Sequence, residues 1–376
     1  MPRIRRIRRK KPRAGSVWKK LLLWGVLGML VLAAAVVAGS YLYVRAYLKS
    51  DGFLAMLEQS AVDDMNVETA RIDPLDWDGS GIRCGGVTME GHEFLTSLQA
   101  RNIETEFSRW ELLKRAFVIT SVNIAELKLR LAPVPFRFRE KPEGARSWAE
   151  ENILPDTFRL EKGSIDSLSV SYGEAGRPYV LDGTRVESAY DAGSSQYRFE
   201  MQGGRLRLPF KGCPEFSLMS GTAQFNHASR RVNVPSCRLT TAAGGYLDIK
   251  GDWDGSSSSW TANMVVNGVP ASSVLEGHWK KHVQGSVSGG IDLRGGRDGV
   301  THVAGLARLQ GGMLTGLPVL DRLALFCGSS RFRNLPLHEA SAQFSYQESA
   351  WHISNILVES ENLVSCLLYT SPSPRD

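Results

Sequence analysis

The sequence predicts a mainly β protein, in which one transmembrane helix precedes a long antiparallel sheet that carries a few short helices. Three observations lead to this fold class. Residues 21–44 form an apolar stretch without a charged side chain, which is long enough to cross a bilayer. Apolar and polar residues then alternate with a period of two, with turns about every ten residues, as expected for antiparallel strands. The 37 glycines disfavour a helical bundle and suit turns.

Positive charge is concentrated at the N-terminus. The chain of 376 residues has 45 Lys and Arg against 39 Asp and Glu. Residues 1–20 hold ten of the basic residues and no acidic one, which leaves 35 basic against 39 acidic residues and a net charge of −4 for the rest. A basic body that binds nucleic acid is therefore not expected. The basic residues interpreted as a topology signal are Arg5, Arg6, Arg8, Arg9, Lys10, Lys11, Lys19 and Lys20.

Residues 21–44 predict a signal anchor that stays in the membrane. As a helix rising about 1.5 Å per residue they span about 36 Å, against a hydrocarbon core of roughly 30 Å. The preceding basic residues place the N-terminus in the cytoplasm, because positive charge stays on that side. A cleaved signal peptide is the alternative, but its apolar region usually has only about 7–15 residues. We therefore expect a cytoplasmic stub at 1–20, an anchor at 21–44 and export of the remaining chain.

The exported part is expected to begin with an α+β module at residues 45–132. Residues 53–62 predict a short helix that leaves the membrane, and residues 118–131 predict a strand. The apolar positions of this strand change phase near Ala125 and Glu126. Such a change predicts a bulge.

A β-rich region is expected at 157–365, after a loop or linker at 133–156 that contains four prolines. Its predicted strands are 165–172, 178–186, 197–208, 215–226, 231–240, 245–253 and 260–266. A small amphipathic helix is predicted at 317–325. Residues 366–376 break the pattern and resemble translated adapter sequence, so we expect a native protein that is longer. A disordered polar tail is the alternative.

The sequence contains no motif for catalysis, for a cofactor or for a metal ion. Walker A, G-x-G-x-x-G and G-x-S-x-G patterns are missing. His278 and His282 are four residues apart, but the glutamate of a zinc-protease helix does not accompany them. Cys213 and Cys237 could pair across neighbouring strands or remain free thiols. We therefore expect a protein that is not an enzyme and has no cofactor.

Two parts of the chain resemble the AsmA-like family. Residues 67–131, which begin VETARIDPLDWDGSGIRCGGVTMEG, are similar to the N-terminal module of that family. Residues 245–364, which include GYLDIKGDWDG and VAGLARLQGGMLTGLPVLDRLALF, are similar to its C-terminal region. The resemblance implies a curved, groove-like sheet in the periplasm, anchored in the bacterial inner membrane. It further implies transport of phospholipids between the inner and outer membranes, or assistance in outer-membrane assembly.

The alternation of residues is compatible with a lipid groove. A strand with this pattern has one apolar face, and each CH₂ group that such a face shields is worth about 0.8 kcal/mol. We expect acyl chains to contact Val287, Ile291, Leu293, Phe344 and Tyr346. The alternative is that these residues pack the core of a closed sandwich.

The expected partners are therefore the inner membrane, phospholipid and other envelope proteins, and not nucleic acid. A second hypothesis is an envelope scaffold, whose sheet edges pair with other proteins and which carries no lipid. A third is an anchored hydrolase, which would need a convergent acid–base cluster that the sequence does not reveal.

Overall fold

The computed structural model describes residues 46, 50–77, 81–91, 93–108, 116–134, 157–174, 176–209, 213–226, 228–275, 277, 279–297, 299–347, 350–360 and 363–367. The basic residues from Arg5 to Lys20 and the predicted anchor at 21–44 lie outside them, as do most of the predicted loop at 133–156 and of the tail at 366–376. Within the described residues, no helix is both long and apolar enough to cross a bilayer.

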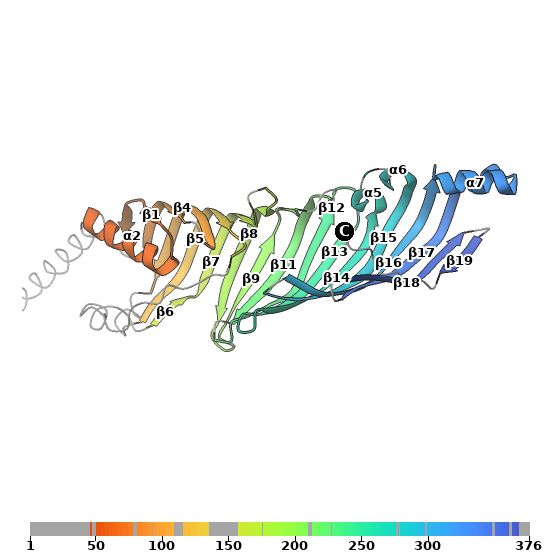
Figure 1. Ribbon diagram of the computed structural model, residues 1–376. Helices are drawn as coiled ribbons and strands as arrows, with labels where there is room; N and C mark the ends of the chain where they lie inside the picture. The colour runs from red at the N-terminus through yellow and green to blue at the C-terminus, as the bar shows by residue number, and fades with distance from the viewer. Residues whose placement is uncertain are drawn as a thin grey trace, which may run out of the picture.

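Strands dominate the described residues (Figure 1), which confirms the mainly β prediction. The first nine are β1 Thr69–Ile72, β2 Leu75–Trp77, β3 Gly81–Glu90, β4 Leu95–Phe107, β5 Ala116–Leu131, β6 Thr157–Leu160, β7 Lys162–Tyr172, β8 Tyr179–Asp191 and β9 Gln196–Gln202. The next ten are β10 Arg205–Arg207, β11 Phe216–Asn226, β12 Arg231–Thr241, β13 Tyr246–Asp254, β14 Ser259–Pro270, β15 Val283–Gly296, β16 Gly299–Thr315, β17 Asn334–Gln347, β18 Ala350–Ser360 and β19 Leu363–Leu367. The helical segments are α2 Asp51–Met65, α5 Ala271–Val274, α6 Trp279–His282, α7 Pro318–Cys327 and η1 Ser330–Arg333.

All of these strands belong to one long sheet. Most of them pair with the next strand along the chain. The pairs are antiparallel from β3 to β5 and again from β7 to β19. β5, however, runs parallel to both β6 and β7. The sheet is therefore mixed, which corrects the wholly antiparallel sheet that the sequence predicts. A parallel pair needs a crossover of a dozen or more residues, and the segment 132–156 between β5 and β6 is long enough to provide it.

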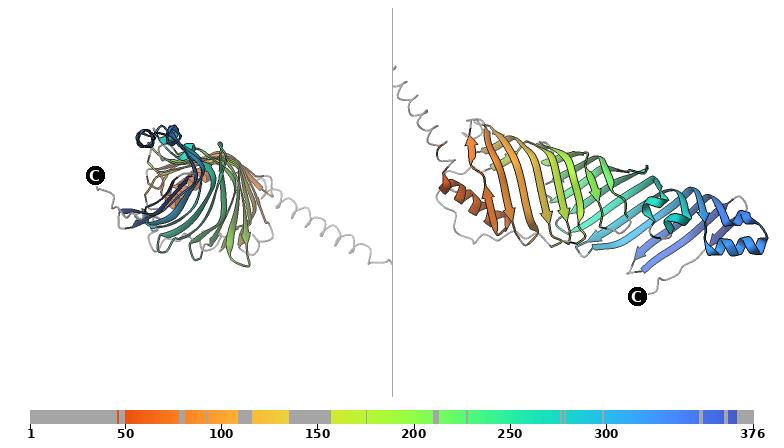
Figure 2. Two further views of the ribbon diagram at one scale, coloured as in Figure 1. Left: turned by 90° about the vertical axis from the view of Figure 1, so that its right-hand side faces the viewer. Right: turned by 90° about the horizontal axis from the view of Figure 1, so that it is seen from above.

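The sheet is elongated, twisted and curved across its strands (Figures 1 and 2). Left-handed glycines interrupt neighbouring strands near one margin: φ is +63° at Gly268 in β14 and +123° at Gly285 in β15. The strand register shifts at both places, and bulges of this kind bend a sheet. Only glycine fits at Gly285, because a Cβ atom there would lie 2.8 Å from the Cα of Gly312.

Short helices lie at the margin of the sheet where β14 leads to β15 and where β16 leads to β17 (Figure 1). α7 begins with Pro318, whose missing N–H costs nothing in a first helical turn. α2 lies before the first strand, and the Oγ of Ser50 caps it by accepting a hydrogen bond of 3.3 Å from the N–H of Phe53. Both α2 and α7 form where the sequence predicts helices, at 53–62 and 317–325.

The hydrophobic core of the described residues is thin. Its main part, which we call the β11–β14 core cluster, consists of Phe216, Leu218, Leu239, Leu247 and Val269. A second cluster joins Leu320 of α7 to Leu335 and Leu337 of β17. Among the described side chains the largest that are less than 2% exposed are Val269 and Thr184. Two packed sheets would bury a continuous layer of side chains between them, and this single sheet has no such layer over its described part.

Candidate functional site

The strand register shows which side chains lie next to one another, because cross-strand partners point to the same face of a sheet. From Leu75 in β2 to Ile353 in β18, every successive partner is apolar or glycine. We call this series the central row. Its members are Leu75, Cys84, Ile103, Ile124, Ile165, Val186, Met201, Gly221, Cys237, Ile249, Met264, Ile291, Gly305, Phe344 and Ile353. The central row is one apolar path across the sheet, without a polar interruption.

Two of the five residues predicted to contact lipid belong to the central row. Ile291 and Phe344 lie on β15 and β17 and both pair with Gly305 of β16. The Phe344 ring covers this glycine, since a Cβ atom at Gly305 would lie 2.5 Å from the ring. The missing side chain of Gly305 is thus replaced by an aromatic surface.

The other three predicted residues lie on the same face. Leu293 and Tyr346 both pair with Val303, in a second row beside the central one. Val287 precedes Ile291 by four residues on β15 and pairs with Val269 of β14. The fold therefore brings all five residues onto one face, and each of their side chains is half-buried.

The two faces of the sheet differ sharply. On β8, Val186 of the central row is 7% exposed, whereas the side chains of Arg185 and Glu187 on either side of it are each 58% exposed. The opposite face carries polar pairs, which include Arg238–Asp248, Arg231–Asp254, Asn233–Asp252 and Asn263–Asp292.

The apolar face is open toward solvent over its later strands. Trp253, Trp351 and Ile353 point to this face and are 42%, 46% and 48% exposed. The helices make their main strand contacts with β1, with β14–β16 and, through η1, with β17. The described helices therefore make their main contacts at margins of the sheet.

The polar face carries exposed ion pairs. Arg238 donates to both carboxylate oxygens of Asp248, at 2.7 and 2.8 Å. These hydrogen bonds lower the pKa of Asp248 and raise that of Arg238. The Arg238 guanidinium also lies 4.8 Å from the centroid of the Tyr246 ring. Exposed ion pairs of this kind contribute little to stability. We therefore interpret them as part of the solvated face opposite the central row.

Two cysteines, Cys84 and Cys237, belong to the central row, and Cys213 packs against the β11–β14 core cluster. All three are free thiols, so the pairing of Cys213 with Cys237 that the sequence leaves open is not formed. Burial raises the pKa of each of these thiols, because removal from water disfavours the charged thiolate.

We expect Cys84, Cys213 and Cys237 to react with iodoacetamide about tenfold or more slowly than the exposed Cys327. The thiolate is the reacting species, and burial both lowers its population and blocks access to it. Alkylation at pH 8 followed by peptide mass spectrometry gives each rate. In the denatured chain the rates should become equal, and equal rates in the folded chain would contradict the burial of these thiols.

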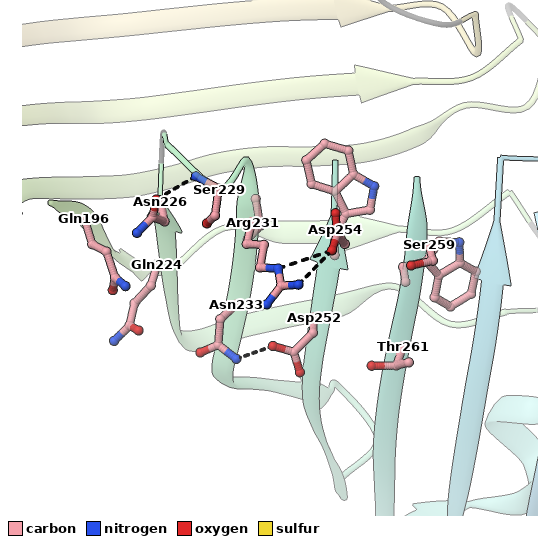
Figure 3. Close-up of a pocket in the computed structure, with 13 residues that line it drawn as sticks. Gln196, Gln224, Asn226, Ser229, Arg231, Asn233, Asp252, Asp254, Ser259 and Thr261 are labelled. Atoms are coloured by element: carbon pink, nitrogen blue, oxygen red, sulfur yellow. Dashed lines mark hydrogen bonds and ion pairs between the residues drawn. The ribbon is translucent and has the colours of Figure 1, made fainter. Parts of the chain in front are cut away.

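A polar cavity of about 540 Å³ lies at the margin where β11 turns into β12 and β13 turns into β14 (Figure 3). Arg231 donates to Asp254 through Nε and Nη2, at 3.2 and 3.1 Å. Asn233 donates from Nδ2 to Oδ1 of Asp252 at 2.7 Å. The cavity is therefore rich in hydrogen-bonding groups, and it also carries both signs of charge.

Backbone geometry fixes the carboxylate of Asp254 in this cavity. The N–H groups of Ser256 and Ser257 donate to its Oδ1 at 2.8 and 3.3 Å, within the turn between β13 and β14. These two bonds, followed by the contact with Arg231, hold its pKa below the usual range. Asp254 is therefore ionised at neutral pH and is not suited to act as a general acid.

Within the described part of the chain, no three His, Cys, Asp or Glu side chains come together as ligands for a metal ion. Of the two histidines that the sequence places four residues apart, His278 lies outside the described residues. The Nδ1 of His282 lies 2.6 Å from the backbone oxygen of Thr315. That contact connects α6 to the end of β16.

Most members of the central row, including Met201, Ile249 and Met264, are not among the residues that the sequence predicts to contact lipid. Alternation is visible in their strands, but only the register shows that they continue the path of Ile291 across the sheet. Most of the aromatic residues near the turns at one margin are also not among the predicted residues. These aromatic residues could have been recognised from the sequence, because each one occurs just before or just after a turn.

Comparisons of this chain with protein-family models, with curated proteins and with solved structures find no match. The resemblance to AsmA-like proteins therefore depends on the quoted sequence segments alone.

Proposed function

We propose that this protein is an envelope protein that holds the acyl chains of phospholipids on the apolar face of its sheet. In this role it aids lipid transport between the inner and outer membranes, or the assembly of the outer membrane. The apolar segment 21–44 anchors it in the inner membrane, with the basic residues from Arg5 to Lys20 in the cytoplasm. The observation that carries the proposal is the unbroken central row, and the sequence resemblance to AsmA-like proteins agrees with it.

The length of the central row supports transport rather than a single binding site. The row makes fourteen strand-to-strand steps between Leu75 and Ile353. At about 4.8 Å per step this is a path of roughly 65–70 Å, about twice the hydrocarbon thickness of a bilayer. Such a path can hold several lipids in series.

The chemistry of the row supports movement along it. An acyl chain on this surface keeps about 0.8 kcal/mol of apolar contact for each shielded CH₂ group. Since each step of the row is apolar, a lipid that moves by one strand exchanges its contacts for equivalent ones. A polar interruption would raise the energy of the chain passing over it, and the central row has none.

We expect a photo-crosslinking residue at Met264 to form covalent adducts with phospholipid, and the same residue at Val265 to form few or none. Met264 belongs to the central row, whereas its neighbour Val265 points to the opposite face and is 44% exposed. Benzoylphenylalanine would replace each residue in the full chain, expressed in a diderm bacterium. After irradiation, mass spectrometry of the protein measures the adducts.

The same experiment distinguishes the scaffold hypothesis. Protein adducts at Met264 in place of lipid adducts would favour a scaffold whose apolar face is covered by a partner. Equal lipid labelling at Met264 and Val265 would show that the label reports membrane proximity and not a lipid path. Either result would count against the proposed function. A second matched pair, Ile291 and Asp292 on β15, repeats the comparison on another strand.

A further inference from the structure

Aromatic residues flank the turns along one margin of the apolar face. The turn between β8 and β9 lies between Tyr190 and Tyr197, and the turn between β13 and β14 lies between Trp253 and Trp260. We call this edge the aromatic margin. Its residues are Tyr190, Tyr197, Phe225, Trp253, Trp260, Tyr346 and Trp351.

Strand register joins the first five of these residues into one row on the apolar face, whereas Tyr346 and Trp351 lie in the neighbouring row that contains Leu293 and Val303. Tyr197 pairs with both Tyr190 and Phe225, and Val232 connects Phe225 to Trp253. The rings of Tyr190 and Tyr197 have centroids 4.9 Å apart. Those of Tyr346 and Trp351, farther along the sheet, have centroids 5.1 Å apart.

Polar groups lie at the same edge of the sheet, on the face opposite to the aromatic residues. The polar cavity in Figure 3 is lined by Trp253 and Trp260 as well as by Arg231, Asp252 and Asp254. Trp and Tyr concentrate at the interfaces of bilayers, since each has an apolar ring with a polar group that stays in contact with water. An edge that carries aromatic rings on one face and polar groups on the other has the chemistry of such an interface.

The opposite margin has a different character. There the β11–β14 core cluster closes the face, with Val269 only 1% exposed. The short helices α5, α6 and α7 occupy the connections at this margin (Figure 1). Along β13, Trp253 lies six positions from Leu247 of the cluster, or about 20 Å at roughly 3.4 Å per residue. The apolar half of a bilayer is about 15 Å deep, so an acyl chain fits between the two margins.

We propose that each phospholipid lies along the strands with its phosphate headgroup at the aromatic margin and its acyl ends near the β11–β14 core cluster. This orientation rests on the proposed function, and it adds which edge of the sheet carries the headgroups. A lipid would then move from strand to strand with its headgroup always in contact with water.

Aromatic pairs beside turns can also simply stabilise hairpins, so the test has to separate the two roles. Tyr172 and Tyr179 provide a control, because they flank the turn between β7 and β8 at the other margin. Their ring centroids are 6.2 Å apart, and they are 42% and 39% exposed. A purely structural role predicts that both aromatic pairs behave alike toward lipid.

The experiment uses the full chain in phosphatidylcholine vesicles that contain a trace of one of two photoactivatable phosphatidylcholines. One carries a diazirine in the headgroup, and the other carries it at the end of an acyl chain. After irradiation, peptide mass spectrometry maps the label. We expect the headgroup probe to label peptides containing Tyr197 and Trp253, and the acyl-end probe to label those containing Leu239 and Leu247.

The variant Trp253→Leu should reduce labelling of the aromatic margin by the headgroup probe about threefold to tenfold. Tyr179→Leu should leave this labelling unchanged, and thermal unfolding of both variants monitors their stability. The same label distribution with both probes, or the reverse distribution, would overturn the orientation while the lipid path stands. No label from either probe on the apolar face would instead overturn the proposed function.

Discussion

Replacing Ile291 by glutamate is expected to reduce phospholipid adducts at Met264 at least about tenfold, which corresponds to about 1.4 kcal/mol. Ile291 is the direct partner of Met264 in the central row and pairs with Gly305 on its other side. A carboxylate at this position would have to lose water when an acyl chain passes over it. Glutamate is too short to extend its charge far from the row, unlike the longer lysine side chain, which can reach water. The photo-crosslinking residue at Met264 measures the loss.

The matched control is Val265→Glu, combined with the same photo-crosslinker at Met264. It introduces the same charge on the neighbouring position of β14, but on the opposite face, where the side chain is already 44% exposed. Adducts should remain at the level of the parent chain. If both glutamate variants lose adducts equally, or if Ile291→Glu loses none, the central row is not the lipid path. Protease resistance of each variant shows whether the sheet remains folded.

Gly289→Ala is expected to lower the free energy of unfolding by roughly 1–3 kcal/mol, whereas Gly290→Ala should change it by no more than about 0.5 kcal/mol. A Cβ atom at Gly289 would collide with the backbone oxygen of Leu306 in β16 and would lie 3.2 Å from the Cα of Ala307. Backbone atoms of a paired strand cannot move aside as a flexible side chain can. At Gly290, which faces the other side, a Cβ atom meets nothing within 4 Å.

Urea unfolding of the full chain in detergent micelles, followed by the circular dichroism of the strands, measures both variants. The comparison is internal to β15, so differences in expression or in detergent affect both chains alike. Similar stability of the two alanine variants would show that β15 and β16 can separate slightly at this position. Close contact between the two strands would then not be needed for the central row.

The strands and their faces could largely be predicted from the sequence, because alternation is a local property. Val287, Ile291 and Leu293 follow one another at even spacing, and the register confirms that they share a face. The helix at α7 could be predicted from its local pattern, which begins at Pro318. In each case the residues that determine the structure are close together in the chain.

Features that depend on distant residues could not be predicted in this way. The parallel pairing of β5 with β7 brings Ile124 beside Ile165 across a long crossover, and nothing near either residue indicates it. The bulge predicted near Ala125 and Glu126 is wrong, since β4 and β5 remain paired in register there. The backbone irregularity lies instead on the neighbouring strand, where Asn102 has a φ of 51°.

In the candidate site, too, local features could be predicted and features that depend on distant residues could not. Single lining residues could be proposed from alternation, but the continuity of the central row depends on fourteen pairings taken together. The orientation of the lipid depends on a contrast between two margins of the sheet, and each margin is assembled from turns that are distant in sequence. Neither property belongs to any one segment of the chain.

The pairing of most strands with their sequence neighbours makes this architecture extensible. Inserting one more hairpin between two existing ones would add two strands, and thus about 10 Å of reach. The strands on either side would keep their own register. Evolution could therefore match such a molecule to compartments of different width by duplicating a unit of some twenty to thirty residues, as in other repeat-like proteins. Selection would have to preserve only the phase of the alternation, because an insertion that shifts it by one residue would expose the wrong side of every new strand.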